Sequence, residues 1–446
     1  MESTLNARSQ PLTATQWLIL LTAGIGFAFD MYEVVVQAIV LKPLLSELGP
    51  FVVGTPPFNY WAGLMLFVPS VIGGLMALVG GYLIDRFGRQ RILVWSIILY
   101  AFAAFMSGLS RSLPEVMAWR CITVAGSCVE FVAAIAWLSE LFAEHRRREA
   151  MLGFAQVCAT IGNFMIAGVY AASVHWGQLL PAIYAGHSAW RYTLIFGALP
   201  AVPLIVLRPF LPESPVWRAR RDAGTLKRPS YRELFAPHLR HSTLIITLLV
   251  ACTYALAWGM LQHIPRVVPG LPQVAELAPK SRELWVSWVH VHVDTGAMLG
   301  RIVLAGLVIG LVSRRPILRW MFLIGLVLFP LVFLGPALGD VAQFKYAALL
   351  VTFVVAVQYS FWGNYLPRMF PLHLRGTGES FAMSIGGRVL APLAALATTQ
   401  LSNVMPGANP TLKLAHSIAL VAVVASLCGL FASRWLPEPS AVLPEE

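Results

Sequence analysis

The sequence has few charged residues. Only 12% of its 446 residues are Asp, Glu, Lys or Arg, whereas 58% are hydrophobic. Soluble globular proteins have roughly 25% charged residues. A charge deficit spread along the whole chain excludes an ordinary soluble protein and is typical of a protein with many membrane-spanning segments.

Cysteine pairs and phosphate-binding loops are also lacking. The five cysteines stand singly in apolar segments, with no C-x-x-C spacing, at Cys121, Cys128, Cys158, Cys252 and Cys428. This pattern argues against a disulfide framework or a zinc site and favours packing roles. No glycine-rich phosphate loop is present, so we expect no ATP-driven step, no cofactor and no enzyme activity. We also expect no cleavable signal peptide, since Met1–Pro11 is polar and the apolar run that follows is too long.

What the sequence does contain is long apolar segments. A membrane-spanning helix needs about 20 mostly apolar residues. Twelve segments qualify, at residues 16–42, 59–82, 90–109, 114–141, 149–173, 189–211, 242–266, 284–312, 317–338, 343–368, 378–403 and 411–435. They are continuous rather than short and alternating, which excludes a β-barrel. The sequence therefore predicts an all-α membrane protein with twelve transmembrane helices.

The positive charge is confined to alternate connections between these segments. The formal net charge is +11, and Arg residues concentrate around 86–91, 146–148 and 218–240. Loops rich in Lys and Arg stay in the cytoplasm. The charge is thus a topology signal and not a nucleic-acid surface. We expect a multi-pass protein of the plasma (inner) membrane with both termini in the cytoplasm.

The two halves of the chain repeat each other. "GYLIDRFGRQRIL" (Gly81–Leu93) aligns without gaps with "GLVIGLVSRRPIL" (Gly306–Leu318). "LPESP" (Leu211–Pro215) aligns with "LPEPS" (Leu436–Ser440) at the same separation. Parallel repeats of six helices are a transporter architecture in which the substrate site lies near the midplane, between the halves.

The repeat predicts three parts. Residues 1–211 form the first six-helix half and residues 242–446 the second, and the basic loop 212–241 links them in the cytoplasm. We expect the protein to be a monomer in the lipid bilayer.

Several motifs are similar to those of the major facilitator superfamily. "GYLIDRFGRQR" resembles the G-x-x-x-D-R-x-G-R-[RK] loop that this family has between its second and third helices. Arg120 and Glu130, followed by Glu140 and Arg147, resemble the fourth-helix pattern of its metabolite–proton symporters. "WRYTLIFGALP", "LPESPVW" and "FPLHLRGTGES" also resemble the sugar-porter, aromatic-acid and metabolite–proton groups. The resemblance covers nearly the whole chain and implies alternating access.

The resemblance also implies a conformational latch on the cytoplasmic side. Its residues would be Asp85, Arg86, Arg89, Glu140 and Arg147. Two positions depart from the family pattern: Gly310 stands where the first copy has Asp85, and Arg368 stands where the family usually has Glu. We therefore expect the charge relay to be asymmetric, because the second half departs from the pattern of the family's cytoplasmic salt-bridge clusters.

Two carboxylates interrupt the first apolar segment, in "GIGFAFDMYEVVVQAIV". Asp30 and Glu33 are three residues apart and share one helix face, and ionisable residues inside a span are functional candidates. At about 1.5 Å per residue, Asp30 and Arg120 both lie ~9 Å from the outer face of a core about 30 Å thick. We therefore predict that they form a pair, with Glu33 nearer the rim of the cavity.

Such a pair can act as a proton switch. Desolvation favours the neutral form of a buried Asp, and a nearby Arg favours the ionised form. Glu130 lies ~15 Å deeper along the fourth span, on a proton pathway. The predicted proton-coupling residues are thus Asp30, Arg120, Glu130 and Glu33. The alternative is that Asp30 and Arg120 form a static pair that only fixes helix packing.

The candidate substrate-binding residues are polar and aromatic residues of the predicted spans. The candidates are Tyr32, Gln156, Trp258, Gln262, Gln358, Trp362 and Arg388. If Asp30 forms an ion pair with Arg120, then Arg388 is free to bind a substrate carboxylate. The alternative for most of these residues is a structural role, since polar side chains in spans commonly form hydrogen bonds between helices. "HVHVD" (His290–Asp294) does not predict a metal site, since His290 and His292 point to different helix faces; we expect it at a solvated periplasmic mouth.

The combined interpretation is a secondary transporter for a small molecule. Proton-coupled symport of a small organic acid or similar metabolite is the first hypothesis. An uncoupled facilitator or exporter of a sugar or organic cation is the second. A transporter-like sensor, which binds its ligand without moving it, is an alternative of another class.

Overall fold

A computed structural model of the chain describes residues 13–141, 145–200, 202–203, 207, 210–223, 230–310, 315–366, 369–371 and 374–437. The regular structure in these residues is helical, apart from one isolated bridge between Ile183 and Gly186. The prediction of an all-α protein is confirmed.

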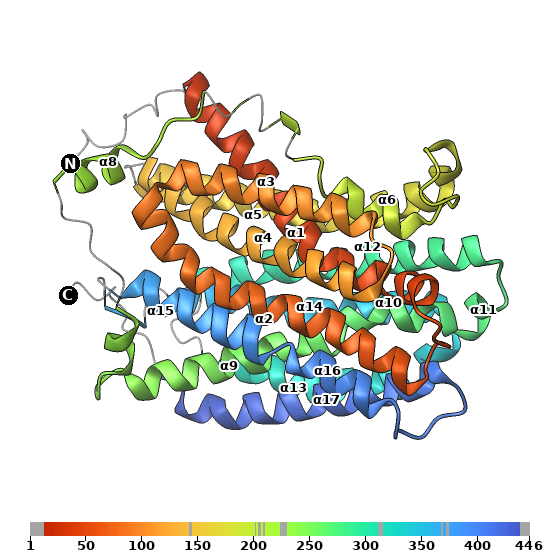
Figure 1. Ribbon diagram of the computed structural model, residues 1–446. Coiled ribbons are helices and arrows are strands. Elements are labelled where there is room, and N and C mark those ends of the chain that lie inside the picture. Colours follow the sequence, from red (N-terminus) through yellow and green to blue (C-terminus); the bar gives the residue numbers. More distant parts are fainter. Residues whose placement is uncertain are drawn as a thin grey trace.

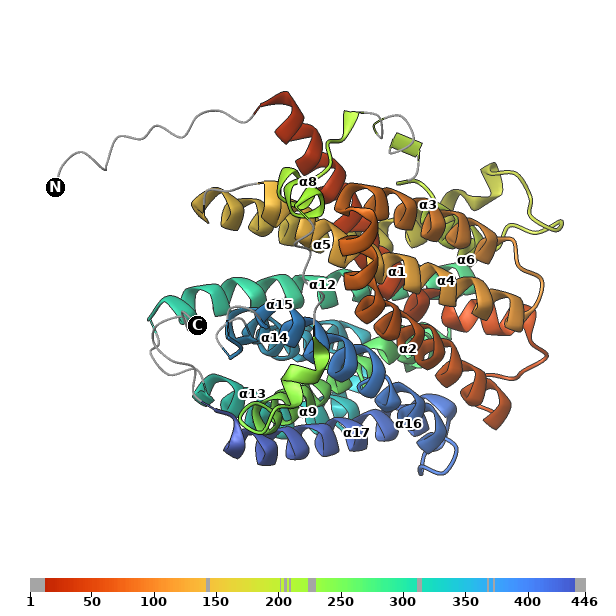
Figure 2. The ribbon, with the colours of Figure 1, turned by 60° about the vertical axis from the view of Figure 1, so that its left-hand side comes forward.

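The helices form two groups, one from each half of the chain (Figures 1 and 2). The first half contains α1 (Ala14–Leu48), α2 (Pro56–Phe87), α3 (Arg89–Gly108), α4 (Leu113–Leu141), α5 (His145–Trp176), η1 (Gly177–Leu179) and α6 (Ala189–Phe196). Helices α8 (Pro215–Asp222) and η3 (Tyr231–Phe235) lie in the connecting segment.

The second half contains long helices together with short helical segments. These are α9 (Arg240–Gly259), η4 (Leu261–His263), α10 (Ile264–Val267), η5 (Val268–Gly270), α11 (Pro272–Ala275), α12 (Pro279–Gly310), α13 (Arg315–Leu334), η6 (Pro336–Gly339), α14 (Val341–Tyr365), α15 (Arg375–Phe381), η8 (Ala382–Leu390), α16 (Leu393–Leu401), α17 (Pro410–Ala432) and η9 (Ser433–Trp435).

The long helices agree with the predicted spans. Among the described residues, 10 helical stretches are long and apolar enough to cross a membrane. The two remaining predicted spans are 189–211 and 284–312. The first contains α6 (Ala189–Phe196) and includes residues outside the described ones, and the second corresponds to α12. Helix α12 has 32 residues, which at about 1.5 Å each suffices to cross a core about 30 Å thick, but its His, Asp and Arg residues make it more polar.

The eleventh predicted span is interrupted. The sequence predicts one helix at 378–403, whereas the structure has α15, the π-helix η8 and then α16. Pro392 lies between the last two, and a proline cannot donate the backbone hydrogen bond that a helix needs. The π-helical turn carries Arg388, and such turns are frequent at functional sites.

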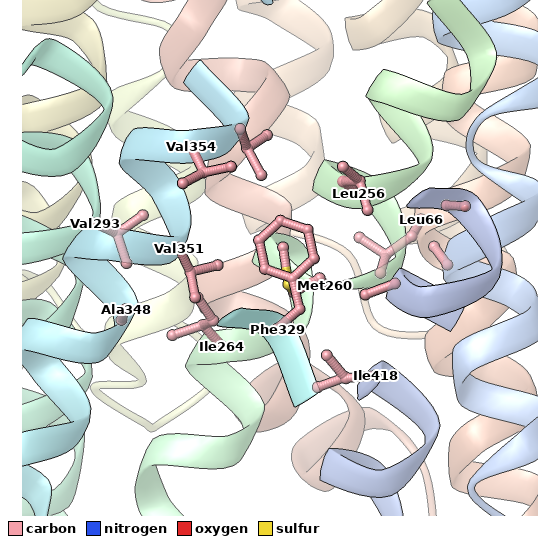
Figure 3. Packing of buried hydrophobic residues seen from close by; sticks show 14 of the residues in the cluster. Leu66, Leu256, Met260, Ile264, Val293, Phe329, Ala348, Val351, Val354 and Ile418 are labelled. Carbon is pink, nitrogen blue, oxygen red and sulfur yellow. The ribbon is translucent and has the colours of Figure 1, made fainter. Parts of the chain in front are cut away.

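The halves are joined at the face remote from the linker. Figure 1 shows α8 and α15 at one end of the molecule and α10 and α11 at the other, which we call the linker face and the far face. One hydrophobic cluster includes Phe58 and Leu66 of α2 together with Leu256 of α9 and Met260, which follows α9. Figure 3 labels Leu66, Leu256 and Met260 of this cluster. A second cluster, around Trp137, lies within the first half and nearer the linker face.

Several polar contacts between the halves lie at the same far face. The Asn59 side chain donates a hydrogen bond to Asn403 at 2.8 Å and accepts one from Arg266 at 3.0 Å. Lys280 donates to the backbone oxygen of His175 at 3.2 Å. Together with the shared hydrophobic cluster, these bonds close the molecule at its far face.

Candidate functional site

Three carboxylates are fully buried in the first half. Asp30 and Glu33 on α1 and Glu130 on α4 have no exposed surface. Gly26, one turn before Asp30, allows the approach of α4, because a Cβ added there would overlap the Glu130 carboxylate. Asp30 is the charged group that acts most on Glu130. Carboxylates gathered in an apolar interior need protons or cations to neutralise them.

Arg120 supplies one of these cations. Its guanidinium forms an ion pair with Glu33 and donates a second bond to the backbone oxygen of Glu33 at 2.5 Å. Arg120 and Glu33 are both buried, so Glu33 does not lie at the rim of a cavity. The structure thus pairs Arg120 with Glu33, where the sequence predicted Asp30.

The length of α1 explains this difference. The helix runs from Ala14 to Leu48, beyond the predicted end at residue 42, so Asp30 lies near its middle. Glu33 is one turn closer to the end at which α4 begins, and Arg120 lies near that end of α4. Counting residues along the predicted span 16–42 gives the sequence-based depth of Asp30 in the membrane. Because α1 is longer than this span, that depth places Asp30 too close to the outer face.

Asp30 instead faces a cation of the other half. Arg388, on η8, is the charged group that acts on the Asp30 carboxylate, and Ser127 is the polar neighbour on α4. Neither Asp30 oxygen accepts a hydrogen bond from a described residue in this conformation. The Arg388 guanidinium also contacts the Cys128 sulfur. The Arg388 side chain therefore reaches across the boundary between the halves. It contacts Cys128, and its charge acts on Asp30 without a direct ion pair between the two, whereas the sequence predicted that Arg388 would be free for a substrate.

The backbone around Arg388 also docks on the first half. Ser70 of α2 donates to the backbone oxygen of Arg388 at 3.1 Å, and a Cβ added at Gly74 would meet the Arg388 side chain. Trp258 of α9 donates to the backbone oxygen of Gly387 at 3.1 Å. Contacts from α2, α4 and α9 thus hold this π-helical turn at the boundary between the halves.

The remaining predicted substrate residues fall into two groups. Tyr32 donates to the backbone oxygen of Thr193 at 2.6 Å and Trp362 donates to Thr253 at 3.1 Å; both are buried within their own halves. Gln262 and Gln358 are buried, and each has side-chain amide atoms without a hydrogen-bond partner among the described residues. The side chain of Gln156 lies outside the described residues.

A second polar group, which sequence reasoning missed, lies in the second half. Arg301 on α12 acts electrostatically on Tyr254 of α9, Tyr359 of α14 and Asp294 of its own helix. His290 Nε2 lies 3.6 Å from Asp294 Oδ2, and both side chains are 6% exposed. The predicted solvated mouth at "HVHVD" is therefore wrong: the face of α12 that carries both residues packs against the interior.

Buried polar atoms without partners occur in both halves. Among the described residues they include side-chain atoms of Gln37, Tyr100, Ser127, Asn163, His263 and Tyr359. An unsatisfied buried polar group costs about 1–3 kcal/mol. The one sequence signal for Gln37 was its spacing, since it follows Glu33 by one helical turn on the same face of α1. This many unpaired groups indicate an interior that receives a polar ligand or water.

The predicted latch is described only in part. Arg86 is exposed and donates to the Tyr82 hydroxyl at 2.8 Å, whereas Arg89 is buried and donates to the backbone oxygen of Ile84 at 3.0 Å. The side chains of Asp85, Glu140 and Arg147 lie outside the described residues, as does Arg368.

Glu213, in the repeated "LPESP" segment, is a further residue of this region. One of its oxygens accepts hydrogen bonds from the backbone N–H groups of Arg89 and Gln90 at 2.9 and 3.0 Å. The carboxylate therefore caps the start of α3, where the helix dipole favours an anion. The repetition of this motif was the sequence signal for its importance.

Comparisons with known proteins agree with this architecture. The family model of the Major Facilitator Superfamily matches residues 18–387. The chain is similar to the cis,cis-muconate transport protein of Acinetobacter baylyi, at 25% identity over 72% of this chain and 73% of that protein. It is also similar to the 3-(3-hydroxy-phenyl)propionate transporter of Escherichia coli, at 26% identity over 74% of this chain and 76% of that protein.

The fold agrees with a solved structure of the same architecture. A crystal structure of a D-xylose-proton symporter superposes with a TM-score of 0.70, covering 96% of this chain and 100% of that chain at 18% identity. The family model spans most of the sequence, and the relatives are transporters. The chain belongs to the major facilitator superfamily and is a multi-pass membrane transporter, not an enzyme.

Proposed function

We propose that the protein is a proton-coupled symporter of a small organic acid that works by alternating access. The observation that carries this proposal is the burial of Asp30: its carboxylate is fully buried, has no hydrogen-bond partner among the described residues, and is acted on by the charge of Arg388 from the other half. A titratable group at the boundary between two halves is suited to link proton binding to their relative movement.

The coupling follows from elementary electrostatics. An ionised Asp30 attracts the Arg388 guanidinium, and the attraction is strong because little water screens it. When Asp30 binds a proton, that attraction is lost and Arg388 no longer ties η8 to α1. Proton binding thus changes the free energy of one arrangement of the halves relative to the other, which is what coupling requires.

The other buried charges have supporting roles in this proposal. Glu130 neighbours Asp30 and lies nearer the linker face along α4, so it continues the proton pathway in that direction. The pair of Arg120 with Glu33 is fixed by two bonds to the same residue. We assign it to positioning α1 against α4, so that Asp30 stays at the boundary.

The moving bodies in this proposal are residues 1–211 and 242–446, joined by 212–241. Both termini lie in the cytoplasm, in agreement with the basic loops. The far face is then the outer face, and the bonds of Asn59 with Asn403 and Arg266 form the closed outer gate. Opening toward the outside would require these bonds to break.

The names of the relatives suggest the first substrates to test. Two of them are transporters of carboxylic acids, cis,cis-muconate and 3-(3-hydroxyphenyl)propionate. Purified protein in liposomes would be given each labelled acid, with and without a pH gradient of one unit, acidic outside. One proton per substrate predicts about tenfold accumulation, since one pH unit corresponds to about 1.4 kcal/mol.

The same experiment separates the alternative functions. A protonophore should abolish accumulation of the acid without abolishing equilibration. Uptake that reaches equal concentrations with or without the gradient would identify an uncoupled facilitator. Binding of the acid without any flux would identify a sensor.

A further inference from the structure

The tyrosine–arginine group of the second half has the composition of a ligand site. The rings of Tyr254 on α9 and Tyr359 on α14 have centroids 4.3 Å apart and planes inclined by 32°. The Arg301 guanidinium on α12 acts electrostatically on both tyrosines. Three different helices therefore bring together one cation and two aromatic rings that are tilted toward each other.

This group faces the boundary between the halves. Arg301 donates a hydrogen bond to the Thr160 hydroxyl of α5 at 2.6 Å. Thr160 lies near the middle of α5, which runs from His145 to Trp176. A bond from the second half to the middle of a first-half helix places Arg301 at the depth where transporters with parallel repeats bind their substrates.

The polar groups here have hydrogen-bonding capacity left. A guanidinium has five N–H donors, and Arg301 makes one hydrogen bond to a described residue. The Tyr359 hydroxyl is buried and has no partner among the described residues. Asp294 neutralises Arg301 in part, yet its buried Oδ2 atom accepts no hydrogen bond from a described residue. These groups therefore leave hydrogen-bond donors and positive charge available to an acidic group.

We propose that Arg301, Tyr254 and Tyr359 form the substrate site for a flat carboxylic acid. The carboxylate binds to the planar guanidinium fork of Arg301 and accepts a bond from the Tyr359 hydroxyl. The rings are too close for a third ring to enter between them, so the unsaturated body of the acid stacks against the outside of the pair. This inference rests on the proposed function. It transfers to Arg301 the anchoring role that the sequence predicted for Arg388, whose guanidinium contacts Cys128.

Two of the expected effects concern the shape and charge of the ligand. Benzoate and cyclohexanecarboxylate carry the same charged group on a flat and a puckered ring, and benzamide is flat but neutral. Aromatic stacking should favour benzoate over cyclohexanecarboxylate by ~2- to 10-fold in Kd. Benzamide should not bind detectably, since it lacks the charge that Arg301 recognises.

Binding of these three probes to the purified full chain would be measured by calorimetry in nanodiscs. Arg301→Gln should weaken benzoate binding by ~10- to 100-fold, because the carboxylate loses a charged hydrogen-bond partner. Arg301→Lys should also weaken it, since Lys lacks the fork. Asp294→Asn should have the opposite effect and tighten binding, because it removes the competing carboxylate.

Matched variants separate the site from general damage to the fold. Arg282→Lys changes an arginine of the same helix whose Nε bonds the backbone oxygen of Leu277. Tyr346→Leu removes a tyrosine of α14 that is 58% exposed, and it is matched to Tyr359→Leu. Only Tyr359→Leu should abolish the preference for benzoate over cyclohexanecarboxylate. All variants would be checked by gel filtration and thermal unfolding.

Several outcomes would overturn the assignment. The first is that the wild-type protein binds none of the acids. The second is that it binds benzoate and cyclohexanecarboxylate with equal affinity. The third is that the Arg301 variants are folded and bind benzoate as the wild type does. Failure of the proposed function looks different: the wild type would then show no response of uptake to the pH gradient. If the wild type accumulates an acid in response to the gradient and Arg301→Gln binds benzoate as the wild type does, the proposed site is refuted but the proposed function is not.

Discussion

Replacement of Asp30 by Asn is the most direct test of proton coupling. The amide has the size of the carboxylate but neither its charge nor its ability to take up a proton at this site. Since both Asp30 oxygens are buried and neither has a hydrogen-bond partner among the described residues, the substitution breaks no hydrogen bond described there. Its main effect is the loss of the charge that faces Arg388.

The expected magnitudes follow from that loss. With a pH gradient of one unit, accumulation should fall from about tenfold to about onefold, because the proton gradient no longer contributes its ~1.4 kcal/mol. Exchange of labelled for unlabelled substrate should persist, since it needs no net proton movement. An unpaired buried Arg388 should also destabilise the protein, by about 3–5 kcal/mol if the pair is fully desolvated.

The assay is therefore accumulation and counterflow in the same liposome preparation. Asp222→Asn is a suitable control, because Asp222 is exposed on α8 and its ion pair with Arg221 is at the surface. The double variant Asp30→Asn/Arg388→Gln should regain part of the lost thermal stability without regaining accumulation. If Asp30→Asn still concentrates substrate tenfold, the coupling site is elsewhere and the reasoning from Asp30 is refuted.

Two further predictions concern packing and the linker face. Arg120→Gln should lower Tm strongly, by the equivalent of about 3–5 kcal/mol, and adding Glu33→Gln should restore most of it; equal losses in the single and double variants would show that the pair is not coupled. Glu213→Gln should weaken the cap of α3 by about 1 kcal/mol. A cysteine introduced at Gln90 should then react faster with a thiol reagent, and an unchanged rate would contradict the role of Glu213 as a cap.

The sequence by itself determined the architecture. Hydropathy is a local, additive property, so each span could be recognised from about 20 consecutive residues without knowledge of its neighbours. The internal repeat showed two halves, and the motif at Gly81–Leu93 indicated the family. The same local logic marked Asp30, Glu33, Arg120 and Glu130 as functional candidates, because charge is expensive inside an apolar segment whatever surrounds it.

Which charges meet was decided only by the tertiary structure. Pairing depends on the length, tilt and rotation of whole helices: α1 extends to Leu48, so Glu33 and not Asp30 reaches Arg120. The cation whose charge acts on Asp30 comes from the other half, on a π-helical turn that the pattern of residues 378–403 did not reveal.

The second polar group had no sequence signal of its own. Tyr254, Arg301 and Tyr359 lie on three helices, and a lone Tyr or Arg in a span is compatible with many environments. Rotation of α12 likewise buries His290 and Asp294, which the sequence suggested were solvated. Local composition indicates that a charge is buried, but only the packing of distant helices determines which group neutralises it.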